Sequence, residues 1–233
     1  MKLVVKCLVT AVALGCAVSA QAHVSVANGP IFSDKNNVIT LNIPHGCDGV
    51  DTYRVEVTLP EDFSSTRPMD SAFWQASVVE NDEGNITQLI WLKDVDKIIL
   101  EDDNLYQVTF RSRVPDLPFS KAYFPTVQYC RNAQGEELTS EWTAIAQEHG
   151  SHAANAKPAP SLTIYPERFK GWNKYTIAEH VHNLSMTFSD AEIVWAGSAA
   201  FSPNPNTMSL INNDASVSEL DAIHPGTEVW VKY

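Results

Sequence analysis

The stretch "TYRVEVTLP" at residues 52–60 decides the fold class, because apolar and polar side chains alternate along it. Every second side chain from position 53 to position 59 is apolar, and Arg54, Glu56 and Thr58 lie between them. A period of two is typical of a β-strand that turns one face to the core and the other to solvent. The stretch therefore predicts a half-buried strand.

Other short runs surround this stretch, and several of them also alternate apolar and polar residues. Most are bounded by Pro, Gly, Asn or Asp. They are "VITLNIP" at 38–44, "ITQLIWL" at 86–92, "LYQVTFRSRVP" at 105–115 and "AYFPTVQYC" at 122–130. The tetrapeptide "NDEG" at 81–84 is typical of a hairpin turn. No run of twelve or more residues keeps a helical period. The predicted fold is all-β, an antiparallel β-sandwich domain followed by a smaller β-rich unit.

A change of composition at 146–161, "AQEHGSHAANAKPAPS", divides the chain. Small residues and two prolines are typical of a linker, which is predicted over residues 147–161. His149 and His152 lie in it with a spacing that can capture a metal ion. A solvated linker with incidental histidines accounts for them more simply.

Residues 162–233 are predicted as a β-rich C-terminal region to which the sequence assigns no role. Its predicted strands are "LTIYP", "YTIAEHVHNLSMTF", "AEIVWAG", "NTMSLI" and "TEVWVKY", with "SPNPN" at 202–206 as a turn. The sequence leaves open whether this region is a separate unit or a set of extra strands on the first domain.

The first 22 residues have the pattern of a secretory signal peptide. Two lysines precede an apolar run at 8–18, and "AQA" at 20–22 matches a small-x-small cleavage site. The run is too short for a membrane-spanning helix, which needs about 20 residues. A lipoprotein cleavage at Cys16 is the less favoured alternative. Cleavage after Ala22 makes His23 the first residue of a periplasmic or secreted protein.

The chain is acidic, with 16 Lys and Arg against 28 Asp and Glu and a net charge of −12. The predicted cleavage removes two lysines and no acid, so the mature net charge is −14. Such a surface repels phosphate backbones and anionic lipid, which argues against nucleic acid as a partner. It attracts cations, although an acidic surface also serves solubility.

Two cysteines, Cys47 and Cys130, remain after the predicted cleavage. An even pair in an exported chain predicts a disulfide. Closing so long a loop stabilises a fold by roughly 4–5 kcal/mol on the chain-entropy model. A Cys/Cys copper site is the alternative, but the sequence offers no third soft ligand nearby.

Cleavage before His23 gives that residue two nitrogen ligands, because a free α-amine and an imidazole both lose protons to a Lewis acid near neutral pH. The amine and Nδ1 of one histidine close a six-membered chelate ring around an ion. Cu(II) prefers tetragonal nitrogen and oxygen ligands and heads the divalent affinity order. Calcium would require oxygen ligands instead. The simpler alternative is that histidine follows the cleavage site by chance.

Five segments occur in a fixed order, and they are "AHVSV" at 22–26, "IPHGCDGVDTYRVEVTLPEDF" at 43–63, "AFWQASVVENDEGNITQLIWL" at 72–92, "DDNLYQVTFRSRVP" at 102–115 and "YFPTVQYC" at 123–130. Together they resemble the YcnI-like family of secreted bacterial copper-binding domains, over about residues 23–146. The resemblance implies a β-sandwich that binds Cu(II) through the amine and imidazole of its mature N-terminal histidine, a monohistidine brace. It also implies glutamate carboxylates that complete the site and a tryptophan close to the metal.

Carried onto this sequence, the resemblance assigns the brace to His23 and the carboxylate ligand to Glu80, which follows Trp74. Glu83 is the candidate for a second oxygen ligand, and Trp142 in "TSEWTAI" is the metal-side tryptophan. An indole N–H is not a normal metal ligand, but the ring can shield a site or supply a cation–π face. The alternatives are a solvated hairpin end for the two glutamates and a core aromatic for Trp142.

Three further histidines are candidate ligands. His45 lies two residues before Cys47 and is either a second imidazole or a side chain that orders the turn. In "EHVHN", His180 and His182 fall on one face of a predicted strand and are able to share a metal ion. The sequence shows no third ligand for that pair.

The leading hypothesis is a periplasmic copper-binding protein, not an enzyme, that acts in copper trafficking or scavenging. Its expected partners are the copper ion and a copper-transport or envelope protein. One alternative is a copper redox enzyme of the polysaccharide monooxygenase type, whose brace uses two histidines. Another is an envelope adhesion or assembly β-module in which any metal is incidental.

Overall fold

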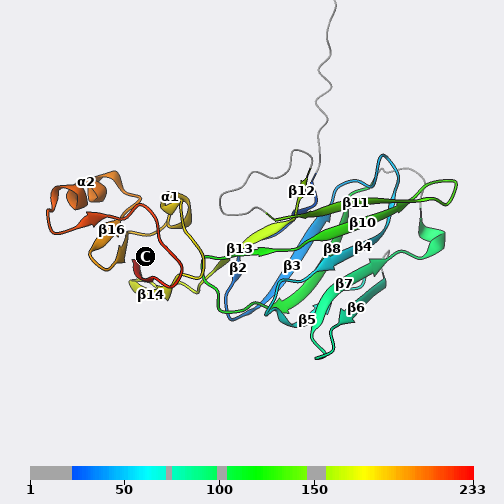
Figure 1. Cartoon of the computed structure of the whole chain (residues 1–233), viewed down its shortest axis with the longest axis horizontal. Coiled ribbons are helices and arrows are strands. Elements are labelled where there is room, and N and C mark those ends of the chain that lie inside the picture. The colour runs from blue at the N-terminus through cyan, green and yellow to red at the C-terminus, as the bar shows by residue number, and fades with distance from the viewer. Residues whose placement is uncertain (1–22, 72–74, 99–103, 146–155) are drawn as a thin grey trace, which may run out of the picture.

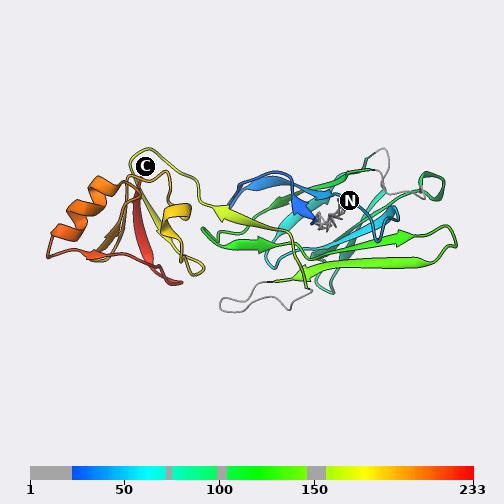
Figure 2. The same ribbon diagram turned by 90° about the horizontal axis from the view of Figure 1, so that it is seen from above.

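The computed structural model describes residues 23–71, 75–98, 104–145 and 156–233 of the chain. Two β-rich units lie end to end along the long axis, a larger sandwich and a smaller C-terminal unit (Figure 1; Figure 2). The predicted signal peptide falls outside the described residues. Within the part of the chain that is described, no helix is long and apolar enough to cross a membrane.

Two sheets share the core of the larger unit. The four-stranded sheet has the order β1-β3-β8-β5, with bounds β1 Ser25–Val26, β3 Asn36–Ile43, β8 Tyr106–Arg113 and β5 Ser64–Pro68. The six-stranded sheet has the order β12-β11-β10-β4-β7-β6, with bounds β12 Lys157–Pro158, β11 Glu137–Ala144, β10 Thr126–Arg131, β4 Thr52–Thr58, β7 Ile86–Leu92 and β6 Gln75–Glu80. A 3-10 turn, η1, spans Val95–Lys97. The predicted all-β sandwich is confirmed.

Strand β4 contains the stretch that predicted the fold, and its alternation is confirmed. Val55 and Val57 are fully buried in the core between the sheets. On the other face Arg54 pairs with Glu56, and its guanidinium lies 4.9 Å from the centre of the Tyr129 ring. The Tyr129 hydroxyl donates a hydrogen bond to Glu56 at 3.1 Å. The outer face of the strand is therefore a polar network that covers much of its own surface.

The predicted turn at 81–84 joins β6 to β7. The Asn81 side-chain oxygen accepts hydrogen bonds from the backbone N–H groups of Glu83 at 3.1 Å and Asn85 at 2.9 Å. Gly84 has a φ of 79°, a conformation that glycine adopts without steric cost. The hairpin prediction is confirmed, and the turn chemistry explains it.

A third sheet has the order β2-β13-β9, with bounds β2 Ile31–Phe32, β13 Ser161–Tyr165 and β9 Lys121–Tyr123. Because β12 and β13 pair with strands of the larger unit, residues 157–165 belong to that unit. The sequence placed 157–161 in a linker and began the C-terminal region at 162, so this pairing moves the boundary. His149 and His152 of the predicted linker fall outside the described residues.

The C-terminal unit has a sheet of its own with the order β14-β18-β15-β16-β17. The bounds are β14 Trp172–Thr176, β18 Glu228–Lys232, β15 Ile193–Ala196, β16 Ala199–Phe201 and β17 Ser218–Glu219, with helices α1 Leu184–Thr187 and α2 Pro205–Asn213. Its apolar side chains form a second core cluster. The sequence left two arrangements open, and the structure has the separate unit.

One predicted strand of this region is helical instead, and a second, "YTIAEHVHNLSMTF", is helical only at Leu184–Thr187. "NTMSLI" lies in α2, where Asn204 caps the helix by accepting a hydrogen bond from the N–H of Asn206 at 2.9 Å, and Pro205 opens the first turn. Asn183 caps α1 by accepting from the N–H of Met186 at 3.0 Å. Asparagine at the cap and proline at the first helical position are helix-start signals, so "SPNPN" marks a helix N-terminus.

Phe119 joins the two units. It comes from the loop before β9, yet its ring packs in the C-terminal core, 4.9 Å from Phe188, 5.5 Å from Tyr175 and 6.2 Å from Tyr165 between ring centres. Its φ is 64°, which is unfavourable for a bulky side chain. The surrounding rings hold the residue in that conformation.

A buried ion pair ties the start of β4 to the end of β7. Lys93 Nζ lies 2.6 Å from Asp51 Oδ2, and the two side chains are 1% and 0% exposed. We expect Lys93→Met to lower the free energy of unfolding by about 3–5 kcal/mol, because it leaves a buried carboxylate without its cation. Urea denaturation measures this loss.

The double variant Lys93→Met/Asp51→Asn is the control for that prediction. It removes both charges, so we expect it to be more stable than Lys93→Met alone. A loss below about 1 kcal/mol in Lys93→Met, the range of exposed pairs, would contradict the structural role of the pair.

Candidate functional site

His23 lies just before β1, the edge strand of the four-stranded sheet, and its side chain is exposed. Its imidazole stands edge-on to Trp142, with ring centres 5.4 Å apart and planes at 68°. The next residue, Val24, is 3% exposed and packs in the core, which anchors the chain beside the site. The structure therefore brings together the two residues that the resemblance placed next to the metal.

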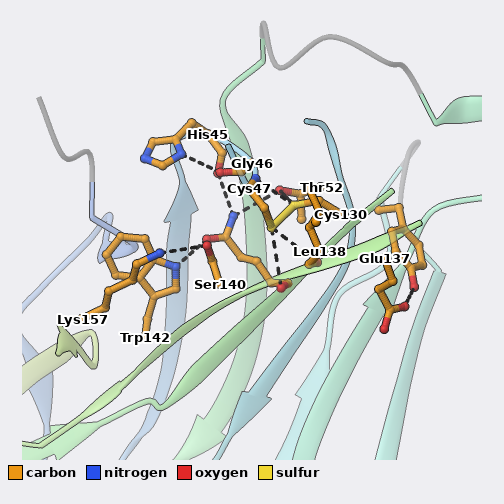
Figure 3. Close-up of a disulfide and its surroundings, with 12 residues drawn as sticks. His45, Gly46, Cys47, Thr52, Cys130, Glu137, Leu138, Ser140, Trp142 and Lys157 are labelled. Atoms are coloured by element: carbon orange, nitrogen blue, oxygen red, sulfur yellow. Dashed lines mark hydrogen bonds between the residues drawn. A yellow bond between two sulfur atoms is a disulfide. The ribbon is translucent and has the colours of Figure 1, made fainter. Parts of the chain in front are cut away.

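Trp142 is held from several sides. Its ring is 2% exposed, and its Nε1–H donates a hydrogen bond to Gln128 Oε1 at 2.5 Å. Lys157 Nζ lies 4.9 Å from the centre of the ring and donates to Ser140 Oγ at 2.9 Å. Figure 3 shows Trp142 and Lys157 side by side. Trp142 is thus a core aromatic and the neighbour of His23, and its place beside a metal ion stays a prediction.

Gln128 links Trp142 to the loop of the disulfide. Its side chain is fully buried, and its Nε2 donates to the backbone oxygen of His45 at 2.7 Å and to Thr52 Oγ1 at 3.1 Å. Two residues beyond His45, Cys47 forms the predicted disulfide with Cys130 (Figure 3). The position of that loop therefore sets the orientation of the Gln128 amide, which in turn fixes the indole.

His45 has the contact expected of a residue that orders a turn. Its Nδ1 lies 2.7 Å from the carbonyl oxygen of Gly46, and because a carbonyl only accepts, Nδ1 carries the proton. Ser25 pairs with Asn42 across β1 and β3. Continued by two residues, this antiparallel register sets His23 opposite Pro44, the residue before His45.

Near the disulfide, the hydroxyl of Tyr53 is hydrogen-bonded to the carboxylate of Glu137. The hydroxyl is the donor, and the guanidinium of Arg131 lies 4.6 Å from the ring centre. Burial, followed by the bond to Glu137, raises the pKa of the Tyr53 hydroxyl. The hydroxyl therefore stays protonated at neutral pH and donates to the carboxylate.

The structure does not bring Glu80 or Glu83 to His23. A row of paired residues crosses the six-stranded sheet from Trp142 in β11 to Val78 in β6. Its members, each paired with the next, are Trp142, Thr126, Val57, Leu89 and Val78. Four strand spacings of about 4.8 Å separate β11 from β6, a distance of about 19 Å. Glu80 ends β6 and Glu83 lies in the turn that follows, and both side chains are exposed. The hairpin end assigned to them from the sequence matches this placement, and the geometry does not support them as ligands of an ion at His23.

The possible ligand atoms at His23 are nitrogens, which suit Cu(II), but there are few of them. The His23 imidazole nitrogen and the α-amine that the predicted cleavage would free are the nitrogen ligands that Cu(II) prefers. In the described part of the chain, no group of three or more His, Cys, Asp or Glu side chains stands ready to hold a metal ion. An ion at His23 would therefore keep positions open to water or to an incoming ligand.

Three residues of interest were missed by the sequence analysis. Gln128 and Lys157 contact Trp142 through long-range strand pairing that no local pattern reveals. His224 lies beside His180, with their ring centres 4.4 Å apart, and His182 stacks on His180 at 5.1 Å. The spacing of 44 residues between His180 and His224 hides the third histidine from a motif search.

Comparisons with known structures agree with the sandwich. A protein from Nocardia farcinica with an immunoglobulin-like fold is 22% identical, with a TM-score of 0.50 over 61% of this chain and 98% of that one. Domains D2 and D3 of the pilin SpaD from Corynebacterium diphtheriae are 12% identical, with a TM-score of 0.36 over 67% and 55%. The type II cohesin A11 from Bacteroides cellulosolvens is 12% identical, with a TM-score of 0.35 over 62% and 98%. The Nocardia protein supports the fold, and the two weaker likenesses add no argument.

A comparison with curated proteins gives no match. A family model described as a domain of unknown function, DUF1775, matches residues 23–164, which is more than half of the chain. YcnI-like proteins carry this domain, so the resemblance is confirmed at the level of the domain. The description of the family model does not mention copper binding. The matched region begins at His23 and ends inside β13. The chain belongs to the DUF1775 family.

Proposed function

We propose that the chain, once cut before His23, binds Cu(II) through the α-amine and Nδ1 of that residue. In this proposal it acts outside the cytoplasm in copper trafficking or scavenging, without turnover. The observation that carries the proposal is the exposed imidazole of His23, held 5.4 Å from the buried ring of Trp142. The disulfide supports an oxidising compartment, because such bonds are rare in the cytosol.

Trp142 would form one wall of this site. Its N–H is committed to Gln128, so the indole offers an ion its ring and not a ligand atom. A ring at this distance favours a nearby cation and keeps water from one side. Lys157 already uses such a contact with the same ring.

The small number of protein ligands favours transfer over storage. A six-membered chelate from one residue captures the ion, while the remaining positions stay exchangeable. A partner that offers further nitrogen or sulfur ligands can then take the ion over. The acidic surface, with a net charge of −14 after cleavage, supports capture of the cation.

A copper redox enzyme of the polysaccharide monooxygenase type is the second candidate. The contacts of Gln128 favour it, because this side chain binds both the backbone of His45 and the ring of Trp142 beside His23, so a second imidazole lies in the loop next to the site. The bond from its Nδ1–H to Gly46 leaves Nε2 as the nitrogen with an available lone pair. The number of imidazoles on the ion distinguishes the two candidates.

Electron paramagnetic resonance of the exported chain with one equivalent of Cu(II) tests the proposal. We expect nitrogen couplings from one amine and one imidazole. A chain whose His23 α-amine is acetylated has no free amine to close the chelate ring, so we expect it to lose this spectrum and most of its affinity. His224→Gln is present in both chains, which weakens competition from the C-terminal histidines.

An unchanged spectrum in the acetylated chain would rule out the amine as a ligand and overturn the proposal. Two imidazole couplings, one of which disappears in His45→Ala, would favour the redox candidate. Reduction of the bound ion by ascorbate and consumption of oxygen would then be measured on the same sample.

A further inference from the structure

We propose that His180, His182 and His224 form a binding site for a divalent ion of the zinc class in the C-terminal unit. The site lies outside the residues that the family model matches, and it does not depend on the function proposed for His23. It rests on strand pairing, on a nitrogen–nitrogen distance and on a buried ring nitrogen.

Backbone pairing places the three imidazoles on one face. Val181 and Ile223 form an antiparallel bridge, with N–H···O distances of 2.9 and 3.0 Å in the two directions. Both side chains are buried, at 4% and 1% exposure, so the residues on either side of them point away from the core. His180 therefore faces His224 across the bridge, and His182 lies next to them on the same face. His180 and His224 form a non-hydrogen-bonded pair, the kind in which opposite side chains approach most closely.

The distance between two ring nitrogens matches shared ligation. His224 Nδ1 lies 3.2 Å from His180 Nε2. Two nitrogens bound to one ion at about 2.0–2.1 Å, with an angle of about 90–110°, are about 2.8–3.4 Å apart. The pair is therefore set at the spacing that a tetrahedral or square ion requires.

His182 supplies the third ligand after a rotation of its side chain. Its ring stacks on His180, with centres 5.1 Å apart and planes at 14°, and it is exposed to solvent. Stacked rings do not aim their nitrogens at one point, which agrees with the finding that no described group of three such side chains stands ready for a metal. To reach the ion, the exposed ring of His182 gives up its present contacts, and the bond to the ion replaces them.

Packing alone does not account for the cluster. The second ring nitrogen of His180, Nδ1, is buried and has no hydrogen-bond partner among the described residues. Buried polar atoms are normally paired, and an unpaired one calls for an explanation. An ion on Nε2 leaves this atom unpaired, but the ligand bonds add stabilisation that offsets the cost of burying it.

The chemistry of the cluster sets the class of ion. Imidazole nitrogens suit Zn²⁺, Cu²⁺ and Ni²⁺, whereas Ca²⁺ and Mg²⁺ require oxygen ligands. Three histidines with a fourth position open to water are a known arrangement for Zn²⁺. The exposed position of His182 and His224 gives the ion direct access from solvent.

Titration of the exported chain with Zn²⁺ alone, followed by calorimetry, tests the site. Every chain carries His23→Ala, so the proposed copper site at the N-terminus does not contribute. We expect one bound Zn²⁺ in this parent. We expect about 100-fold weaker binding in His224→Gln, which breaks the preset pair, and about 10-fold weaker binding in His182→Gln. Cobalt(II) as a spectroscopic probe should give the visible bands of a tetrahedral nitrogen site in the parent and lose them in His224→Gln.

His149→Ser/His152→Ser is the matched control, because it removes two histidines of the same chain outside the cluster. We expect it to bind Zn²⁺ as the parent does. A parent that binds no Zn²⁺, or a His224→Gln chain that binds it as tightly as the parent, would overturn the site. Loss of binding in the control alone would overturn it as well. His182 is exposed, so its variant tests the ligand role even if His224→Gln disturbs the fold.

Discussion

His23→Ala is expected to weaken Cu(II) binding by the exported chain by about three orders of magnitude, or about 4 kcal/mol. The substitution keeps the α-amine but removes the imidazole, so the chelate ring cannot form. The imidazole is exposed, and the neighbouring Val24 carries the packing at this edge, so the fold should be unaffected. Competition against a chelator of known Cu(II) affinity measures the change.

The copper experiment requires control over the second histidine cluster. All chains carry His182→Gln and His224→Gln, so that copper at the C-terminal unit does not hide the loss. Glu80→Gln is the matched control. Glu80 ends β6, which lies about 19 Å across the sheet from the strand of Trp142, so the substitution should leave the Cu(II) affinity unchanged. Equal affinity in His23→Ala and its parent would refute the copper proposal. A large loss in Glu80→Gln would show that the hairpin reaches the ion after all.

Removal of the disulfide is expected to lower the free energy of unfolding by about 4.5 kcal/mol on the chain-entropy model. The bond joins residues 83 positions apart, and loops of that length gain much from closure. Cys47→Ala/Cys130→Ala is the suitable variant, since both sulfurs are buried and alanine leaves no unpaired hydroxyl. Urea denaturation of the oxidised parent and of the variant measures the difference.

The same variant should also affect the copper site. The backbone oxygen of His45, two residues from Cys47, holds the Gln128 amide that receives the Trp142 N–H. A looser loop therefore frees the indole, and we expect altered near-ultraviolet circular dichroism of Trp142 even where the variant remains folded. Trp142→Phe in the parent identifies that signal. A stability loss below about 1 kcal/mol would mean that the loop is already ordered without the bond.

The fold was predictable because its signal is local. In β4, Val55 and Val57 are buried and Arg54 faces outward, as a period of two requires. The turn at 81–84 was found for a similar reason, since Asn81 and Gly84 form it within four residues. Helix α2 was missed although its start signal is also local, because the apolar spacing of "NTMSLI" was given more weight than Asn204 and Pro205 before it.

The candidate site was predictable only in part, because its members meet through distant pairing. Trp142 was placed near the N-terminus by family resemblance, and the structure puts its ring against His23. Glu80 was assigned by family resemblance, from its place after Trp74, but a place in the sequence does not say which edge of a sheet a strand occupies. His224 is 44 residues from His180 and becomes its neighbour only through the bridge between Val181 and Ile223.

The position of Phe119 makes the stability of each unit depend on the other. The residue belongs by sequence to the matched family region, but its ring is solvated unless residues beyond 164 fold around it. A fragment that ends with the family region would expose this aromatic ring on an unfavourable backbone conformation. Phe119 therefore contributes to thermodynamic linkage between the units, and an ion that stabilises the C-terminal histidines would also stabilise the sandwich that holds His23.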